Sequence, residues 1–151
     1  MLFKRNIFIC GIVVGLFLSF ATLTPLNAAD TTDQIITHID EILKANPLPA
    51  GEKVQRIGIA QDDTISFLVV RVVEGAEIKS HFHKTHDEAV YVIRGVGQML
   101  INDKWVDIKP GSVHFNPMAK VHAAKNTGSG DLVVISIFTP QMKEPDTHFV
   151  Q

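Results

Sequence analysis

From residue 54 onward, hydrophobic and polar positions form short runs that do not follow a helical period. The runs are rich in Val, Ile and Phe, and Gly, Pro, Asn and Asp separate them, as expected for strands joined by tight turns. The pattern predicts strands at Val54–Ala60, Ile65–Val73, Ile78–His83, Glu88–Arg94, Gly97–Ile101, Trp105–Ile108, Ser112–Asn116, Val121–Lys125 and Leu132–Thr139. Asn102-Asp103 fits a two-residue hairpin turn. Eight or nine such strands indicate one all-β sandwich or barrel.

One earlier segment has the period of a helix. Its apolar side would be formed by Ile35, Ile36, Ile39, Ile42 and Leu43. Thr31, with Gln34 three residues later, fits a capping box, and Asn46-Pro47 should end the helix because proline disfavours a helical residue before it. We expect the apolar stripe to pack on the barrel or on a partner subunit.

The first residues have the three parts of a secretory signal peptide. Lys4 and Arg5 precede an apolar run over 7–23, and Ala28-Ala29 follows as a small-residue cleavage site. The alternative is an uncleaved anchor, although the run is at the lower length limit for a spanning helix. We expect cleavage after Ala28 or Ala29, export to the periplasm or medium, and no stable membrane anchor afterwards. The predicted boundaries are 1–29 for the signal, 30–50 for the helix, 51–140 for the barrel and 141–151 for a polar tail.

Composition narrows the chemistry of the mature chain. The only cysteine, Cys10, lies in the signal, so disulfides and thiolate ligands are excluded after cleavage. The 16 acidic residues are all mature, and two of the 14 basic residues are lost with the signal, which leaves 12 − 16 = −4. No basic cluster is present, so nucleic acid is not an expected partner.

Histidines and one glutamate mark a candidate metal site. On a strand, residues two apart face the same side, so His81 and His83 point together. Glu88 follows a short turn, and His122 begins a later strand. Three imidazoles and a carboxylate inside a barrel suit a divalent transition metal. An HxH pair alone is a weak signal, so the spacing of the surrounding residues matters.

That spacing resembles the two motifs of the cupin superfamily. The first motif is matched at Gly75, His81, His83, Glu88 and Gly95. The second is matched at Gly111, Pro117, His122 and Asn126. Ala119 departs from it, because the family usually has glycine at this position. A left-handed turn there would cost alanine about 1 kcal/mol and alter the approach of His122.

The resemblance implies a single cupin barrel of the double-stranded β-helix or jelly-roll type, with one short N-terminal helix. It implies that His81, His83, Glu88 and His122 bind one Fe, Mn, Zn, Ni or Cu ion and leave one or two positions open. Cupins of this kind include dioxygenases, decarboxylases and isomerases, and single-domain members are commonly homodimers. We expect a dioxygenase-type oxidoreductase acting on a small molecule, with a non-catalytic metal or small-ligand binding protein as the alternative.

Three further residues have open roles. His86, in the turn between ligands, is either a solvated turn residue or a partner of ligand or substrate. His114 lines the cavity if Val113 and Phe115 face outward, and otherwise lies on the surface. His86 and His114 are therefore the catalytic candidates. Arg94 is expected to be a surface charge, although its strand face would also allow it to reach the cavity.

Overall fold

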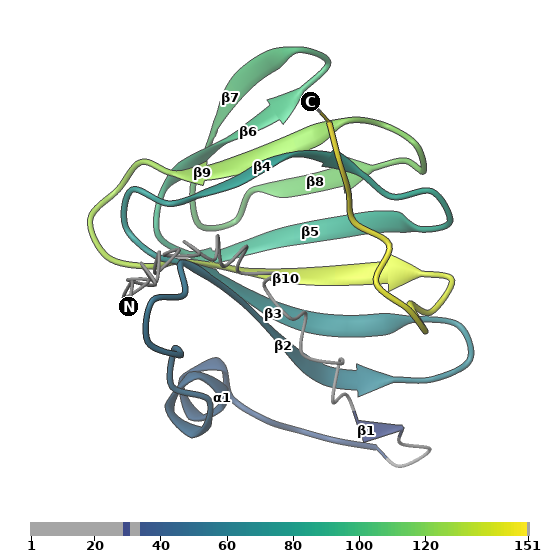
Figure 1. The fold of residues 1–151 in the computed structure, drawn as a ribbon. Coiled ribbons are helices and arrows are strands. Elements are labelled where there is room, and N and C mark those ends of the chain that lie inside the picture. The colour runs from purple at the N-terminus through teal and green to yellow at the C-terminus, as the bar shows by residue number, and fades with distance from the viewer. Residues whose placement is uncertain (1–28, 31–33, 151) are drawn as a thin grey trace, which may run out of the picture.

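The computed structural model describes residues 29–30 and 34–150, which form two sheets facing each other (Figure 1). One sheet has the order β1 (Ala29–Asp30), β2 (Val54–Gln61), β3 (Ser66–Val72), β10 (Leu132–Thr139), β5 (Asp87–Arg94) and β8 (Val113–Asn116). The other has the order β11 (His148–Phe149), β4 (Glu77–Phe82), β9 (His122–Asn126), β6 (Gly97–Ile101) and β7 (Lys104–Ile108). The all-β fold class is confirmed.

All nine predicted strands are present, and each end lies within one residue of the predicted one. The hairpin between β6 and β7 is also confirmed. Asn102 and Asp103 have φ of 49° and 61°, and Ile101 pairs directly with Lys104. Positive φ at both central residues is the condition for the type I′ turn that suits a twisted hairpin.

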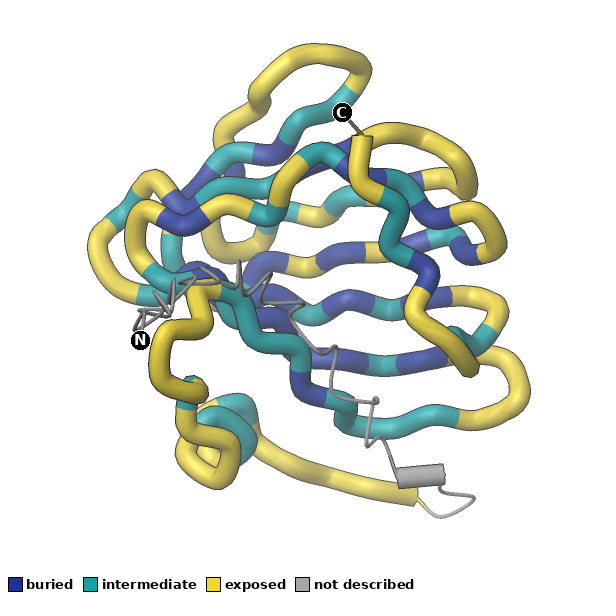
Figure 2. Tube along the Cα trace, viewed as in Figure 1, coloured by how far each residue is buried: buried dark blue, intermediate teal, exposed yellow. Residues whose placement is uncertain are grey.

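Strand alternation produces a buried apolar interior between the sheets, which Figure 2 shows as dark blue segments. The core cluster consists of Val70, Val72, Ala76, Val90, Val92, Met99, Ile108, Leu132 and Val134. On β5 the inward positions are Val92, Val90 and then Glu88, whereas Ala89 and Tyr91 between them are exposed. The same alternation that fills the core with valine therefore delivers one carboxylate to the interior.

The helix is shorter than the sequence predicted. It covers α1 (Ile39–Ala45) and begins after His38, which makes no side-chain capping bond. The predicted capping box is therefore wrong for this helix; Thr31 itself lies outside the described residues. Ile36 is 92% exposed and Ile35 is 50% exposed, so neither is part of the packed stripe. The end at Asn46 is as predicted.

The rest of the apolar stripe packs on the barrel, one of the two expected alternatives. Ile39, Ile42 and Leu43 pack against a small cluster of Ile57, Val69 and Val133 on the outer face of the six-stranded sheet. No residue of α1 is fully buried. The helix thus covers part of this face and lies away from the barrel interior.

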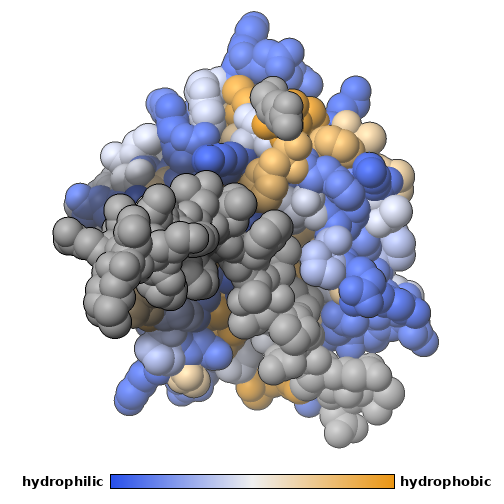
Figure 3. All heavy atoms as spheres, viewed as in Figure 1, coloured by the Kyte–Doolittle hydropathy of each residue, from blue (hydrophilic) through white to orange (hydrophobic). Residues whose placement is uncertain are grey.

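The C-terminal segment runs back across the molecule. In β11, His148 and Phe149 pair with Phe82 and His81 of β4. Figure 3 shows hydrophobic surface near this end of the chain, where Phe149 and Val150 are exposed. Within the described residues, no helix is long and apolar enough to cross a membrane.

Candidate metal centre

Both sheets contribute to a cluster of buried polar side chains in the barrel. His81 on β4 lies directly opposite His122 on β9. His83 follows the end of β4 by one residue, and Glu88 comes from β5 in the other sheet. All four side chains are buried. The structure therefore brings together the four residues that the sequence singled out.

The three histidine rings are fixed by backbone carbonyl groups. Nδ1 of His81, His83 and His122 lies 2.8, 2.8 and 2.9 Å from the carbonyl oxygens of Lys79, Asp146 and Lys120. A carbonyl oxygen only accepts, so each Nδ1 carries the hydrogen and each Nε2 keeps its lone pair. Carbonyl groups orient metal-binding histidines in this way.

The free nitrogens meet inside the barrel. One ring nitrogen from each histidine lies within 4.8 Å of the other two. Nε2 of His83 and of His122 is buried and has no hydrogen-bond partner. Buried polar atoms rarely lack a partner, and a ligand or ion is one of the usual reasons. These residues therefore fit a divalent metal ion.

Glu88 supplies a carboxylate beside the imidazoles. Its Oε2 lies 3.3 Å from His122 Nε2 and 3.9 Å from His83 Nε2, and it accepts a 2.8 Å hydrogen bond from Asn116 Nδ2. Burial raises the pKa of Glu88, but its contact with His122 and the nearby ring of His83 outweigh burial and lower the pKa to about 2. The side chain is therefore ready to bind a cation as a carboxylate.

The histidines are also held in their metal-binding form. Burial, followed by the charge of His122, lowers the pKa of His81 from 6.5 to about 4. Burial likewise lowers the pKa of His83, although the Asp146 carbonyl and Glu88 oppose it. A metal binds only neutral imidazole, so these shifts favour binding at neutral pH.

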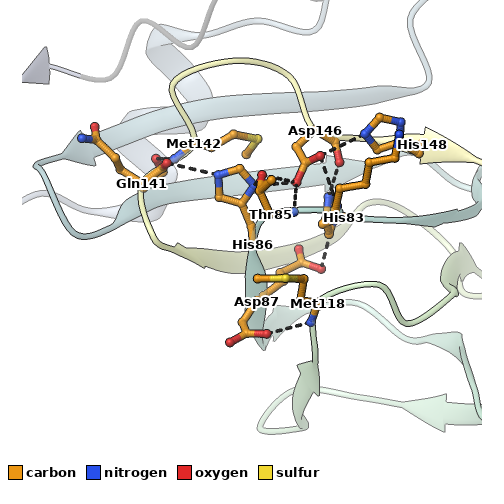
Figure 4. Close-up of polar contacts among 12 residues, drawn as sticks. His83, Thr85, His86, Asp87, Met118, Gln141, Met142, Asp146 and His148 are labelled. Carbon is orange, nitrogen blue, oxygen red and sulfur yellow. Dashed lines mark hydrogen bonds and ion pairs between the residues drawn. The ribbon is translucent and has the colours of Figure 1, made fainter.

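The turn between β4 and β5 is fixed by Asp146 from the C-terminal tail (Figure 4). Its carboxylate accepts hydrogen bonds from the backbone N–H groups of Lys84 and Thr85, at 3.1 and 2.9 Å, and from Thr85 Oγ1 at 2.9 Å. It also contacts His86 Nδ1 at 2.6 Å. Burial raises the pKa of Asp146, but the hydrogen bonds from His86 and Thr85 outweigh it, so the pKa is lowered. The tail thereby sets the position of His83.

The turn before β9 has a different construction. Ala119 has φ of 62°, which confirms the left-handed turn expected where the family usually has glycine. Its N–H donates to the carbonyl oxygen of His83 at 2.7 Å, and the N–H of Met118 donates to Asp87 Oδ1 at 2.7 Å. The two ligand-bearing turns therefore touch each other.

The two catalytic candidates stand outside the cavity wall. Both ring nitrogens of His86 face oxygens of the tail, Asp146 Oδ2 and the Gln141 carbonyl. Val113 and Phe115 are 78% and 58% exposed, so His114 lies on the opposite face of β8, but it is not among the residues that line the cavity beside the four candidate ligands, contrary to the first alternative. His114 hydrogen-bonds to Asn116, which in turn donates to Glu88. Each candidate thus contacts a residue that supports a ligand, and its catalytic role stays a prediction.

The remaining candidates lie at the surface. Arg94 pairs with Asp40 of α1 at 2.8 Å, so its surface interpretation is the correct one. His38 is exposed. His148 is less exposed than the sequence suggested, because its Nε2 contacts Asp146 at 3.0 Å and its ring stacks on Phe82.

A small cavity of about 50 Å³ adjoins the four candidate ligands. Most of its other walls are apolar, and its additional polar groups are Arg56 and Ser136. The sequence analysis missed Arg56, Asn116 and Asp146. Neither Arg56 nor Asp146 had a sequence signal, because Arg56 follows Gln55 in a strand of mixed polarity and Asp146 lies in a polar tail.

Known proteins are similar to this chain over much of the barrel. Residues 68–138 match the family model described as a cupin domain (Cupin_2). The chain has the cupin fold. A solved protein with a double-stranded β-helix domain from Klebsiella pneumoniae superposes with a TM-score of 0.66 at 21% identity, covering 78% of this chain and 100% of that one. The family match covers 71 of the 151 residues, and the likeness to the solved structure is a likeness of fold.

Two proteins that are similar to part of this chain have names that state a function. Glucose-6-phosphate isomerase of Thermococcus onnurineus is 36% identical over 67 residues, which are 40% of this chain and 35% of the isomerase. An oxalate-binding protein of Thermotoga maritima is 31% identical over 71 residues, which are 47% of this chain and 59% of that protein. This chain therefore spans only part of the length of either relative.

Proposed function

We propose that this cupin binds one divalent transition metal through His81, His83, Glu88 and His122 and acts as a dioxygenase-type oxidoreductase on a small molecule. The supporting observation is the convergence of three imidazole nitrogens, two of them buried without a hydrogen-bond partner. Fe, Mn, Zn, Ni and Cu all suit this donor set. An oxidoreductase would need one of the redox-active ions among them.

Each part of the chain has a defined task in this proposal. The carbonyl groups of Lys79, Lys120 and Asp146 hold the three Nδ1–H groups and aim Nε2 inward. Asn116 orients the Glu88 carboxylate. A bound redox-active ion would supply oxygen and substrate activation at positions that four protein ligands leave open. The apolar walls would keep bulk water out.

The cavity favours redox chemistry over proton transfer. Among the described residues that line it, every histidine and the only carboxylate are proposed ligands. An isomerase or decarboxylase that depends on a separate general base or acid would lack that group here. The similarity to an isomerase covers 35% of that protein and does not alter this argument.

A non-catalytic binding protein is the second candidate. The same lack of a separate acid or base supports it, and so does the similarity to a protein named for binding oxalate. Here the open positions at the metal would bind a small oxygen-donor ligand without changing it.

Electron paramagnetic resonance separates the two candidates. The full chain is loaded with Fe(II) without oxygen and treated with nitric oxide, a surrogate for oxygen. The oxygenase proposal predicts the paramagnetic signal of a nitrosyl iron adduct. Full iron occupancy without an adduct would exclude the oxygenase and leave the binding protein, whereas an adduct calls for an oxygen-uptake screen of small phenols, keto acids and sugars.

We further propose that the protein is exported, from the signal pattern of residues 1–29. Residues 1–28 lie outside the described ones, so the proposal of export rests on the sequence alone. Intact-mass measurement of the exported protein should show a first residue of Ala29 or Asp30. A full-length chain that pellets with membranes would contradict this proposal.

We also propose a homodimer. Tyr91, Val113 and Phe115 form an exposed apolar group on the outer face of the six-stranded sheet, where Tyr91 and Val113 pair across β5 and β8. Exposed apolar groups of this kind often mark contacts between subunits. Light scattering at micromolar concentration should give twice the mass of the mature chain, and a monomer mass would count against the dimer.

A further inference from the structure

Arg56 brings a positive charge into the barrel. It lies on β2, directly opposite Val70 of β3, and Val70 in turn lies opposite Val134 of β10. Val70 and Val134 belong to the interior cluster, so Arg56 is on the inward face of the sheet. It lines the same cavity as His81, His83, Glu88 and His122.

Among residues 29–30 and 34–150, the guanidinium has no polar side-chain partner, unlike two other arginines. Arg71 pairs with Asp131 at 2.6 Å and Arg94 pairs with Asp40 at 2.8 Å. Within the described part of the chain, Arg56 makes no side-chain hydrogen bond or ion pair. Burial lowers the pKa of Arg56, and the charge of Glu88 opposes this effect. A partly buried cation without a partner among the described residues is costly, unless a ligand supplies the opposite charge.

The charge of the loaded site points to the kind of ligand. Arg56 and Glu88 are the charged residues among those that line the cavity, and they cancel. A divalent metal bound by neutral histidines would then leave a net charge of about +2 in a mostly apolar cavity. An incoming dianion would neutralise it.

We propose that Arg56 binds the outer anionic group of a small organic dianion, typically a dicarboxylate, whose other end is held at the metal. The inference rests on the proposed metal site and assigns its substrate or ligand class. A guanidinium presents two parallel N–H groups that match the two oxygens of a carboxylate.

Calorimetric titration of the zinc-loaded full chain tests the assignment. The probes are malonate and malonamate, its monoamide, which keeps one carboxylate but lacks the second charge. We expect malonate to bind at least about tenfold more tightly than malonamate. Arg56→Gln should remove this preference, and Arg56→Lys should retain part of it through the charge alone. Arg94→Gln, which changes a surface arginine, should leave it unchanged.

Zinc content is measured on every variant first. This separates a failure of the metal site from a failure of the role assigned to Arg56. If wild-type and Arg56→Gln proteins each hold one zinc and bind malonate equally, the role of Arg56 is refuted while the metal site stands. Zinc-loaded wild-type protein that binds no malonate at about 10 mM refutes the ligand class in the same way. A wild-type chain that takes up no zinc contradicts the metal site, and the inference falls with it. If Arg56→Gln does not fold, the comparison with Arg56→Lys decides.

Discussion

The two turns that carry metal-site residues are held in different ways. The turn between β4 and β5, which links His83 to Glu88, is fixed by the buried carboxylate of Asp146 through several hydrogen bonds. The turn before His122 has few polar contacts and includes Ala119 in a left-handed conformation. One ligand position is therefore stabilised by a distant part of the chain, and the other is reached through local backbone strain.

This difference indicates where each turn is vulnerable. The first depends on residues more than 60 positions apart in sequence, because Asp146 closes it from the tail. The second depends on its own backbone and on two hydrogen bonds, from Ala119 to the His83 carbonyl and from Met118 to the Asp87 carboxylate. Replacing Asp146 in the tail should therefore disturb the site more than replacing Ala119 with a residue that relieves the backbone strain.

The largest effect is expected from Asp146→Ala. It removes the acceptor of buried donors from Lys84, Thr85 and His86, and losing one partner of a buried charged contact costs about 3–5 kcal/mol. Urea unfolding of the metal-free chain should show this loss. Glu144→Ala, on an exposed part of the same tail, serves as the control. Equal stability of the two variants would mean that Asp146 does not hold the turn.

Acidification tests whether the fold keeps His81 of β4 neutral. His81 has a folded-state pKa of about 4 against 6.5 when exposed, so between these values the unfolded chain binds the proton and the folded chain does not. Stability of the metal-free protein should therefore fall as pH drops from 6.5 to 4, with about 3 kcal/mol due to His81.

Glu88, whose pKa is lowered to about 2, adds a further loss of stability below pH 4.5. Urea unfolding across this pH range, compared between wild type and His81→Gln, isolates the part due to His81. Parallel curves for the two proteins would show that His81 is not held neutral by the fold.

The smallest effect is expected from Ala119→Gly. Glycine adopts the left-handed region without the Cβ clash, so the unfolding free energy should rise by about 1 kcal/mol. Lys120→Gly, in the same turn but outside the left-handed region, should instead lower it by about 0.4–1 kcal/mol. Thermal unfolding distinguishes the two variants, and destabilisation by Ala119→Gly would show that this turn is not strained.

The contrast between the turns also explains what the sequence could predict. His81, His83, Glu88 and His122 lie on or beside strands with clear alternation, so the sequence could predict both the barrel and the convergence of these residues. Ala119 was predictable because a family motif marks its position. Asp146 was not, since its role arises only when the tail pairs with β4.

The helix start was mispredicted for a related reason. The capping box at Thr31 and Gln34 is a local signal, but the helix begins at Ile39, where side chains first pack against Ile57 and Val69. Tertiary packing outweighed the local preference. Arg56 was overlooked because an arginine in a strand gains meaning only when the opposite sheet encloses it.

The metal content of the purified full chain tests the central claim most directly. Elemental analysis of protein loaded with a divalent transition metal should give one ion per wild-type chain and a strong loss in His83→Ala, Glu88→Ala and His122→Ala. His38→Ala changes an exposed histidine that directly precedes α1. This variant should keep one metal ion per chain. Full occupancy in His83→Ala, or no metal in the wild-type protein, would contradict the metal centre.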